Sequence, residues 1–231
     1  MAIKIVVGGS DVSASQLKDL FRQIEDGSLK GYHIQGLLEH RNPFENAMDT
    51  QSQLERACAL YAEVFGITID PTSVKIPERK SGFDRLIVIP AGLSMNQLIA
   101  FFKTKFDVSL YIEDLDGDVK ENDRANTETY CLWVRDVVEA DEELKNLSAN
   151  QLKEQKISGV TLLERLVHEL LYYMETGKHL DVVNWTLCSG SRNSNGNVPY
   201  VHWNADRRKL LVIWLNPAHQ YDILRARAVV S

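Results

Sequence analysis

The stretch RLIVIPAGLSMNQLIAFFKTKFDVSLYIE, residues 85–113, decides the fold that the sequence predicts. Its first six residues are an apolar run typical of a buried strand, and its last seven are typical of a second strand. Between them, Ser94 and Gln97 form a capping box, which predicts a helix over residues 94–106. A strand, a crossover helix and a strand make a βαβ unit, so we expect the two strands to be a parallel pair in one sheet.

The residues before this unit predict mainly helices. A short strand, IKIVV at 3–7, precedes apolar residues at helical spacing near 14–26, 29–40 and 52–66. The following segment, 66–84, contains two prolines and is expected to be an extended connector. The first third of the chain is therefore predicted to be helical.

The residues after the unit predict a strand at 129–138, a long helix and a β-rich end. The helix TLLERLVHELLYYMET starts at the capping box of Thr161 and Glu164, and Gly177 ends it. Beyond it, short apolar runs alternate with polar turns, which is typical of an antiparallel meander. The four strands are expected near 184–188, 198–203, 209–215 and 225–230.

The predicted fold class is therefore α+β, with a helical N-terminal third, a central βαβ-containing sheet and a C-terminal four-stranded antiparallel meander. We expect residues 1–231 to form a single domain, because the long helix and the meander each need a partner layer. If the chain divides, the expected parts are a helical part, 1–66, and an α/β and β-meander part, 84–231.

Composition favours a cytoplasmic protein. The three cysteines, Cys58, Cys131 and Cys188, lie far apart, which fits a reducing compartment. The N-terminus does not have the pattern of a signal peptide, and the apolar run at 210–215 is too short to span a bilayer. The net charge of −6 argues against a nucleic-acid partner, because that affinity needs a basic face.

The acidic stretch EDLDGD, residues 113–118, is a candidate metal site. Asp114, Asp116 and Asp118 could bind Mg²⁺ or Ca²⁺ through oxygen atoms, as a metal-dependent hydrolase or nuclease requires. The stretch is not an EF-hand loop, because Ala125 stands where that loop has its glutamate. The alternative interpretation is a solvated turn that Asp and Gly close without any ligand.

Histidine and cysteine patterns give weaker hypotheses. His168 and Glu169 resemble half of a zinc-protease motif, but Tyr172 replaces the second histidine, so His168 is expected at the boundary of the helix's apolar face. Cys188 and His202 could meet across a hairpin as a nucleophile and its base. We expect Cys188 to be a buried structural cysteine instead.

The C-terminal strands suggest a binding site for an anion or a protein partner. Arg225 and Arg227 should share one strand face, and Arg192 lies in the polar loop 189–197, which is expected to be exposed. Guanidinium groups bind carboxylate and phosphate through paired donors, and Trp185 or Trp203 could stack on a ring. The alternative is that the arginines pair with neighbouring acidic side chains and the tryptophans belong to the core.

The stretches SASQLKDLFRQIEDGSLKGYHIQGLLEHRNPFE, TGKHLDVVNWTLCSGSRNSNGNVPYVHW and LRARAVVS resemble parts of short open reading frames, without assigned function, in genomes of uncultured candidate-phylum bacteria. The resemblance implies a bacterial, cytosolic protein and carries over no functional residue.

Two classes of function stay open. The first is a non-catalytic binding or interaction protein that uses the C-terminal meander and needs no cofactor. The second is a hydrolase or nuclease that uses the acidic stretch and Mg²⁺ or Ca²⁺.

Overall fold

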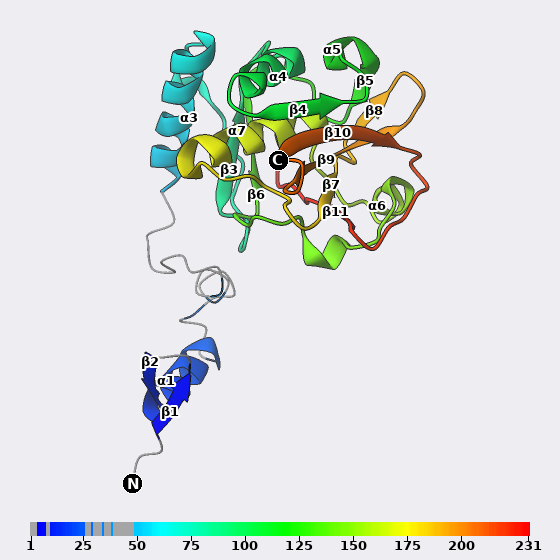
Figure 1. Ribbon diagram of the computed structural model, residues 1–231. Coiled ribbons are helices and arrows are strands. Elements are labelled where there is room, and N and C mark those ends of the chain that lie inside the picture. Colours follow the sequence, from blue (N-terminus) through cyan, green and yellow to red (C-terminus); the bar gives the residue numbers. More distant parts are fainter. Residues whose placement is uncertain (1–3, 8–9, 26–28, 30–33, 35–37, 39–48) are drawn as a thin grey trace. The chain divides into compact units, whose positions relative to one another are not determined.

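The computed structural model describes residues 4–7, 10–25, 29, 34, 38 and 49–231 (Figure 1). It divides the chain into two compact units, Met1–Met48 and Asp49–Ser231. The division lies outside the expected connector, 66–84. That the chain unfolds as one cooperative domain stays a prediction.

The smaller unit contains a β-hairpin and a helix. Strands β1 (Lys4–Val7) and β2 (Ser10–Ser13) pair antiparallel, and helix α1 (Ala14–Glu25) follows directly. The predicted strand and helix are both present, but the residues expected to form only a turn make the second strand. The predicted helix at 29–40 lies largely outside the described residues.

The larger unit is α+β, as predicted. Its helices are α3 (Thr50–Phe65), α4 (Met95–Lys103), α5 (Leu115–Asp118), α6 (Ala149–Glu154) and α7 (Leu162–Thr176), with 3-10 turns η1 (Pro71–Ser73) and η2 (Glu142–Leu144). Its strands are β3 (Arg85–Ile89), β4 (Asp107–Leu110), β5 (Val119–Asn122), β6 (Tyr130–Val134), β7 (Trp185–Leu187), β8 (Ser191–Asn193), β9 (Val198–Asn204), β10 (Lys209–Leu215) and β11 (Leu224–Ala226).

Strands β3 and β4 flank α4, but they do not pair with each other. Strand β3 pairs antiparallel with β6, whereas β4 pairs parallel with β10 at the edge of another sheet. The predicted parallel pair is therefore wrong. Every residue of β3 is buried, whereas alternate residues of β4 are exposed. The partner of each strand is set by tertiary packing, which the local strand-helix-strand pattern does not contain.

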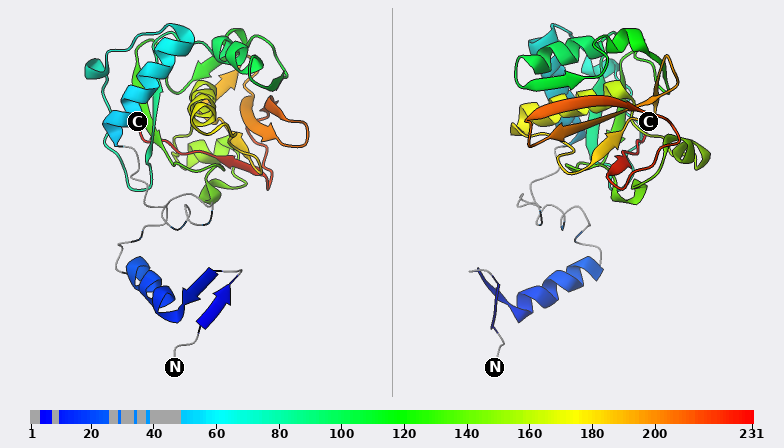
Figure 2. Two further views of the ribbon diagram at one scale, coloured as in Figure 1. Left: turned by 60° about the vertical axis from the view of Figure 1, so that its left-hand side comes forward. Right: turned by 45° about the vertical axis from the view of Figure 1, so that its right-hand side comes forward.

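Helix α7 is the centre of the larger unit. It lies between the β3–β6 pair and the five-stranded sheet, as Figure 2 shows, and it contacts both β3 and β9. Thr161 and Glu164 form the predicted capping box, and Gly177 ends the helix with φ 67°. Because layers cover the helix on two sides, its polar residues Arg165 and Glu169 are as buried as its leucines.

The five-stranded sheet has the order β11-β7-β9-β10-β4. Strands β7, β9 and β10 are antiparallel neighbours, as the meander predicted. Strand β11 departs from it, because it pairs parallel with β7 at the far edge. The connection at 216–223 carries the chain across the sheet and contacts α6, where the Asn150 N–H donates to the Pro217 carbonyl at 3.1 Å.

The two faces of this sheet have different neighbours. On the inner face, Val201, Leu210 and Val212 join the main core, which also contains Leu166 and Leu170 of α7. On the outer face, a smaller core packs beneath α6 and η2. It contains Leu144, Ala149, Leu152, Leu187, Val198, Tyr200, Leu224 and Ala226.

Segment 66–84 belongs to the larger unit. Its apolar side chains, including Ile69, Val74 and Phe83, pack against the main core, and the Trp133 indole N–H donates to the Pro77 carbonyl at 2.8 Å. Apart from the turn η1 the segment is irregular, as its prolines predicted. Within the described ranges, no helix has both the length and the apolar character needed to cross a membrane.

Candidate functional site

The acidic stretch closes a helix terminus instead of forming a metal site. Asp116 accepts hydrogen bonds from the backbone N–H groups of Met95 and Asn96, at 2.9 and 3.0 Å, at the start of α4. Asp114 caps α5 by accepting from the Gly117 N–H and the Asn96 amide. These hydrogen bonds, that of Asn96 first, lower the pKa of Asp114. The carboxylates therefore satisfy N–H groups that a helix leaves unpaired.

The predicted metal site does not form from these residues. Among the residues that the structure describes, no group of three or more His, Cys, Asp or Glu side chains is placed to hold a metal ion. Asp114 and Asp116 serve as caps, and Asp118 accepts from the Ser194 hydroxyl at 2.9 Å. The hydrolase or nuclease hypothesis therefore has no ligand set at 113–118.

The polar loop 189–197 packs beside the acidic stretch. Strands β5 and β8 pair antiparallel, which places Glu121 opposite Arg192. The loop was expected to be exposed throughout, but only its tip, 194–196, is exposed, while Ser191 and Asn193 are buried. The Asn193 side chain closes the tip by accepting from the N–H groups of Asn195 and Asn197, so the buried polar groups have partners.

The three predicted arginines do not form one site. Arg192 donates to the carbonyls of Ser189 and Ser191, both at 2.8 Å. Arg225 forms an ion pair with Glu142 and donates to the Ala140 carbonyl. Arg227 is 1% exposed, so it cannot bind a ligand at the surface. The three arginines therefore do not meet at one surface site: Arg227 pairs with buried Asp181, and Arg225 pairs with Glu142, whose side chain is 69% exposed, as the alternative interpretation expected.

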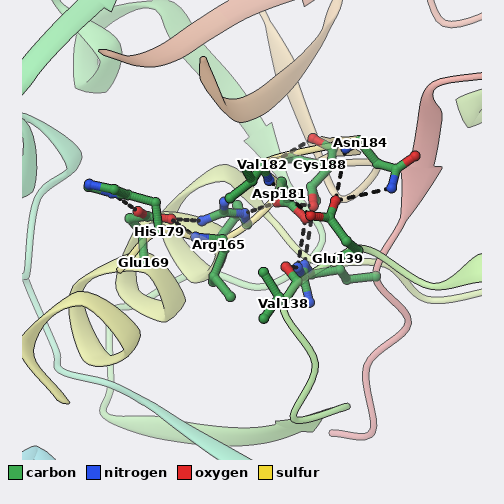
Figure 3. A network of polar contacts seen from close by, with 12 residues as sticks. Val138, Glu139, Arg165, Glu169, His179, Asp181, Val182, Asn184 and Cys188 are labelled. Carbon is green, nitrogen blue, oxygen red and sulfur yellow. Dashed lines mark hydrogen bonds and ion pairs between the residues drawn. The ribbon is translucent and has the colours of Figure 1, made fainter. Parts of the chain in front are cut away.

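A buried charge network around Arg165 and Asp181 (Figure 3) links α7 to the five-stranded sheet, and Arg227 takes part in it through its contacts with Asp181 and Thr186. Asp181 accepts from Arg165 Nε at 2.8 Å and from Arg227 Nη2 at 2.6 Å. Arg165 also pairs with Glu169 at 2.9 Å, one helical turn away. Arg227 donates further to the Thr186 hydroxyl and to the carbonyls of residues 137 and 138. All four charged side chains are almost completely buried.

The charges of the network stabilise one another's ionised forms. Burial alone would raise the pKa of Asp181, but Arg227 and Arg165 hold it below its ordinary value. Burial likewise disfavours the charged form of Arg165, yet Asp181 and Glu169 raise its pKa. The ion pairs therefore favour the charged forms of Asp181 and Arg165 despite their burial. The sequence signal for the network is the pair Arg165 and Glu169, four residues apart in a leucine-rich helix.

His179 joins the network to an aromatic cluster. Its Nδ1 lies 2.8 Å from a Glu169 oxygen, and its ring stacks on Trp203 with 3.3 Å between centroids. Tyr173 and Phe106 also contact the imidazole. Glu169 therefore connects Arg165 on one side with His179 on the other, which fixes the orientation of the imidazole.

Trp185 and Trp203 lie on opposite faces of the sheet. Residues alternate between the faces, and Trp203 packs on the inner face with the main core. Trp185 lies on the outer face, where it stacks on Tyr200 and His202 with centroids 4.7 and 5.1 Å apart. The two indoles therefore cannot bind the same small ligand.

Two histidines of the larger unit are held neutral. Burial, together with the nearby Arg165, lowers the pKa of His202 to about 4. Burial first, and then Arg227, Arg85 and Arg165, hold the pKa of His168 well below its ordinary value. Neither Nδ1 atom has a hydrogen-bond partner within 49–231. His168 is therefore fully buried and not at the boundary of the helix's apolar face.

Stability is expected to fall as the pH falls from 6.5 toward 4. The unfolded chain protonates His202 near pH 6.5, whereas the folded chain does so only near pH 4, so acid favours the unfolded state in this window. Between about pH 7.5 and pH 5 the free energy of unfolding of the wild type should fall, and His202→Phe should make this decrease smaller by about 2 kcal/mol. Urea unfolding of both proteins at the two pH values measures this difference. An identical pH dependence would contradict the expectation. Burial raises the pKa of Asp141, so this residue stabilises the folded state as the pH falls. Asp141 is present in both proteins, so its effect cancels in the comparison.

The cysteines do not supply a nucleophile. Cys58, Cys131 and Cys188 are free and buried, and burial raises the pKa of each thiol. Cys188 packs in the main core, whereas His202 stacks on Trp185 at the outer face. Cys188 is therefore the structural cysteine that the sequence predicted, and the two do not form a nucleophile and base.

On the outer face of the five-stranded sheet, Tyr200 belongs to the smaller core and Trp185 and Ile213 pack against it, whereas Leu211 lies outside both cores of the described residues. Half-buried Trp185, Leu211 and Ile213 lie there beside Tyr200 and His202. Comparison with known proteins adds no relative: no protein-family model, curated protein or solved structure matches this chain.

Proposed function

We propose that this chain is a non-catalytic binding protein of the bacterial cytoplasm that recognises a protein partner through its outer sheet face. The outer sheet face is the surface of Trp185, Tyr200, His202, Leu211 and Ile213, extended by Tyr221. Three free, buried thiols agree with a reducing compartment. A net charge of −6 makes a nucleic-acid partner unfavourable.

The observation that carries the proposal is a group of aromatic and aliphatic side chains on the outer faces of strands β7, β9 and β10, of which Trp185, Leu211 and Ile213 are half-buried. Register places Leu211 opposite His202 and Ile213 opposite Tyr200, while Trp185 stacks on the rings of Tyr200 and His202. Leu211 is half-buried and packs against neither core among the described residues. Trp and Tyr are the residues that most often dominate protein interfaces, because they contribute large areas at small entropic cost.

The rigid position of these side chains also favours binding. His202 and Tyr200 are buried, and their rings are stacked 5.9 Å apart at 10°. Tyr221, which is exposed, meets Trp185 edge-on. Because these side chains are already ordered in the free protein, binding of a partner would not have to immobilise them, which lowers the entropic cost of association.

Leu211→Glu is expected to abolish partner binding while the chain still folds. The added carboxylate would be buried in the interface, whereas in the free protein it can reach water from a half-buried position. Protein retained from a bacterial lysate should fall by about tenfold or more, because the substitution places a charge among the apolar side chains of the surface. Quantitative mass spectrometry measures retention, and calorimetry with the recovered partner confirms it.

Phe21→Glu is the matched control. Phe21 is an exposed apolar residue of α1 in the smaller unit, so the substitution adds the same charge at a residue that is not part of the outer sheet face. It should retain the wild-type set of proteins. If Leu211→Glu also retains that set, the outer sheet face is not the binding surface.

A further inference from the structure

A pocket of about 300 Å³ opens between α3 and α7 at the start of β3. Ala57 and Leu60 of α3 form one wall, and Leu171 and Met174 of α7 form the other. Leu86 of β3 also lines it, so the interior is largely apolar. The volume is at the lower end of the range for small-molecule sites.

Arg85 is the most deeply buried of the charged residues that line the pocket, which also include Arg56, Glu63 and Glu175. Its side chain is only 8% exposed, and its two terminal nitrogens donate to both oxygens of Glu175, at 2.7 and 2.9 Å. Its Nε is buried and has no hydrogen-bond partner within the larger unit's described residues. A guanidinium at this depth requires an anion, because an unpaired buried charge is strongly destabilising.

Glu175 is a replaceable partner for this arginine. It lies in the last turn of α7, and its side chain is 29% exposed, much more than that of Arg85. Glu175 can therefore turn toward solvent, whereas Arg85 cannot. Another carboxylate could then accept the same two hydrogen bonds from Arg85, since the guanidinium fork matches any carboxylate.

From this geometry we infer that the pocket between α3 and α7 binds a small carboxylic acid with an apolar body. The ligand carboxylate takes the place of Glu175 on Arg85, and the apolar body lies between Ala57, Leu60 and Leu171. Glu175 is the internal group that keeps Arg85 paired while the pocket is empty. The exchange is one ion pair for another, so it forms and breaks no covalent bond.

Calorimetric titration of the full chain with octanoate and phenylacetate tests the inference. At least one of the two acids should bind saturably. The acid that binds with higher affinity indicates whether the pocket prefers an aliphatic chain or an aromatic ring. Octanol, which has the apolar body without the charge, should bind much more weakly. Failure of both acids to bind, or equal binding of octanol, would overturn the inference.

Variants at the pocket separate this ion-pair exchange from non-specific binding. Glu175→Gln should tighten the binding of the better acid several-fold, because the internal competitor loses its charge. Ala57→Leu should abolish binding by filling the pocket. Glu63→Gln, at a lining carboxylate that does not contact Arg85, is the matched control and should change affinity little. Unchanged affinity in both Glu175→Gln and Ala57→Leu would overturn the inference. If Glu175→Gln does not fold, Ala57→Leu decides alone.

Discussion

Asp181→Asn is expected to lower the free energy of unfolding by about 3–5 kcal/mol, because it leaves Arg165 and Arg227 buried without their shared anion. Asparagine has nearly the shape of aspartate and tolerates the left-handed backbone at this position, where φ is 54°. The loss therefore reports the charge and not the backbone. Urea unfolding followed by tryptophan fluorescence at neutral pH measures it.

Glu142→Gln is the matched control for this experiment. It removes the same charge from a pair with an arginine, Arg225, but the Glu142 side chain is 69% exposed. Solvent screens such a pair, so the expected loss is below about 1 kcal/mol. Equal losses in the two variants would show that burial does not set the strength of the network.

Trp133→Ala is expected to cost about 3–5 kcal/mol, since it removes one of the largest fully buried side chains of the main core. The residue also joins three parts of the larger unit. Its indole N–H donates to the Pro77 carbonyl at 2.8 Å, and its backbone pairs with Val230. Urea unfolding measures the loss.

Trp133→Phe separates the two contributions. It keeps an aromatic ring in the core but loses the hydrogen bond to Pro77, so the expected cost is about 1–2 kcal/mol.

Limited proteolysis of Trp133→Phe should cut faster within segment 66–84 than in the wild type. In the wild type, cleavage there should release no stable fragment, because the segment packs on the main core. A stable fragment would contradict the prediction of one cooperative domain.

Local signals in the sequence predicted the helices well. The capping boxes at Ser94 and Thr161 and the glycines at 66 and 177 mark helix termini, because these groups satisfy the backbone within one turn. Strand pairing was harder to predict. That β3 joins β6, and that β11 joins β7, depends on which faces other layers cover, and the apolar pattern of one strand does not contain that information.

The buried charges show a similar difference between local and tertiary information. Arg227 was expected at the surface because arginine usually is, and its partner Asp181 lies 46 residues away in the chain. The aspartates at 114–118 were a candidate metal site with a solvated turn as the alternative, and the N–H groups that Asp114 and Asp116 accept from belong to α4 and α5. In both cases the sequence shows the charged group but not its partner.

The position of β11 has a consequence for synthesis of the chain on the ribosome. Residues 224–230 pair with β7, with Trp133 of β6 and with Gly159, so they complete segments that are translated long before them. Until Arg227 emerges, Asp181 lacks one of its two cations. We therefore expect the larger unit to complete its interior only after β11, and not directly after the central helix, has been translated.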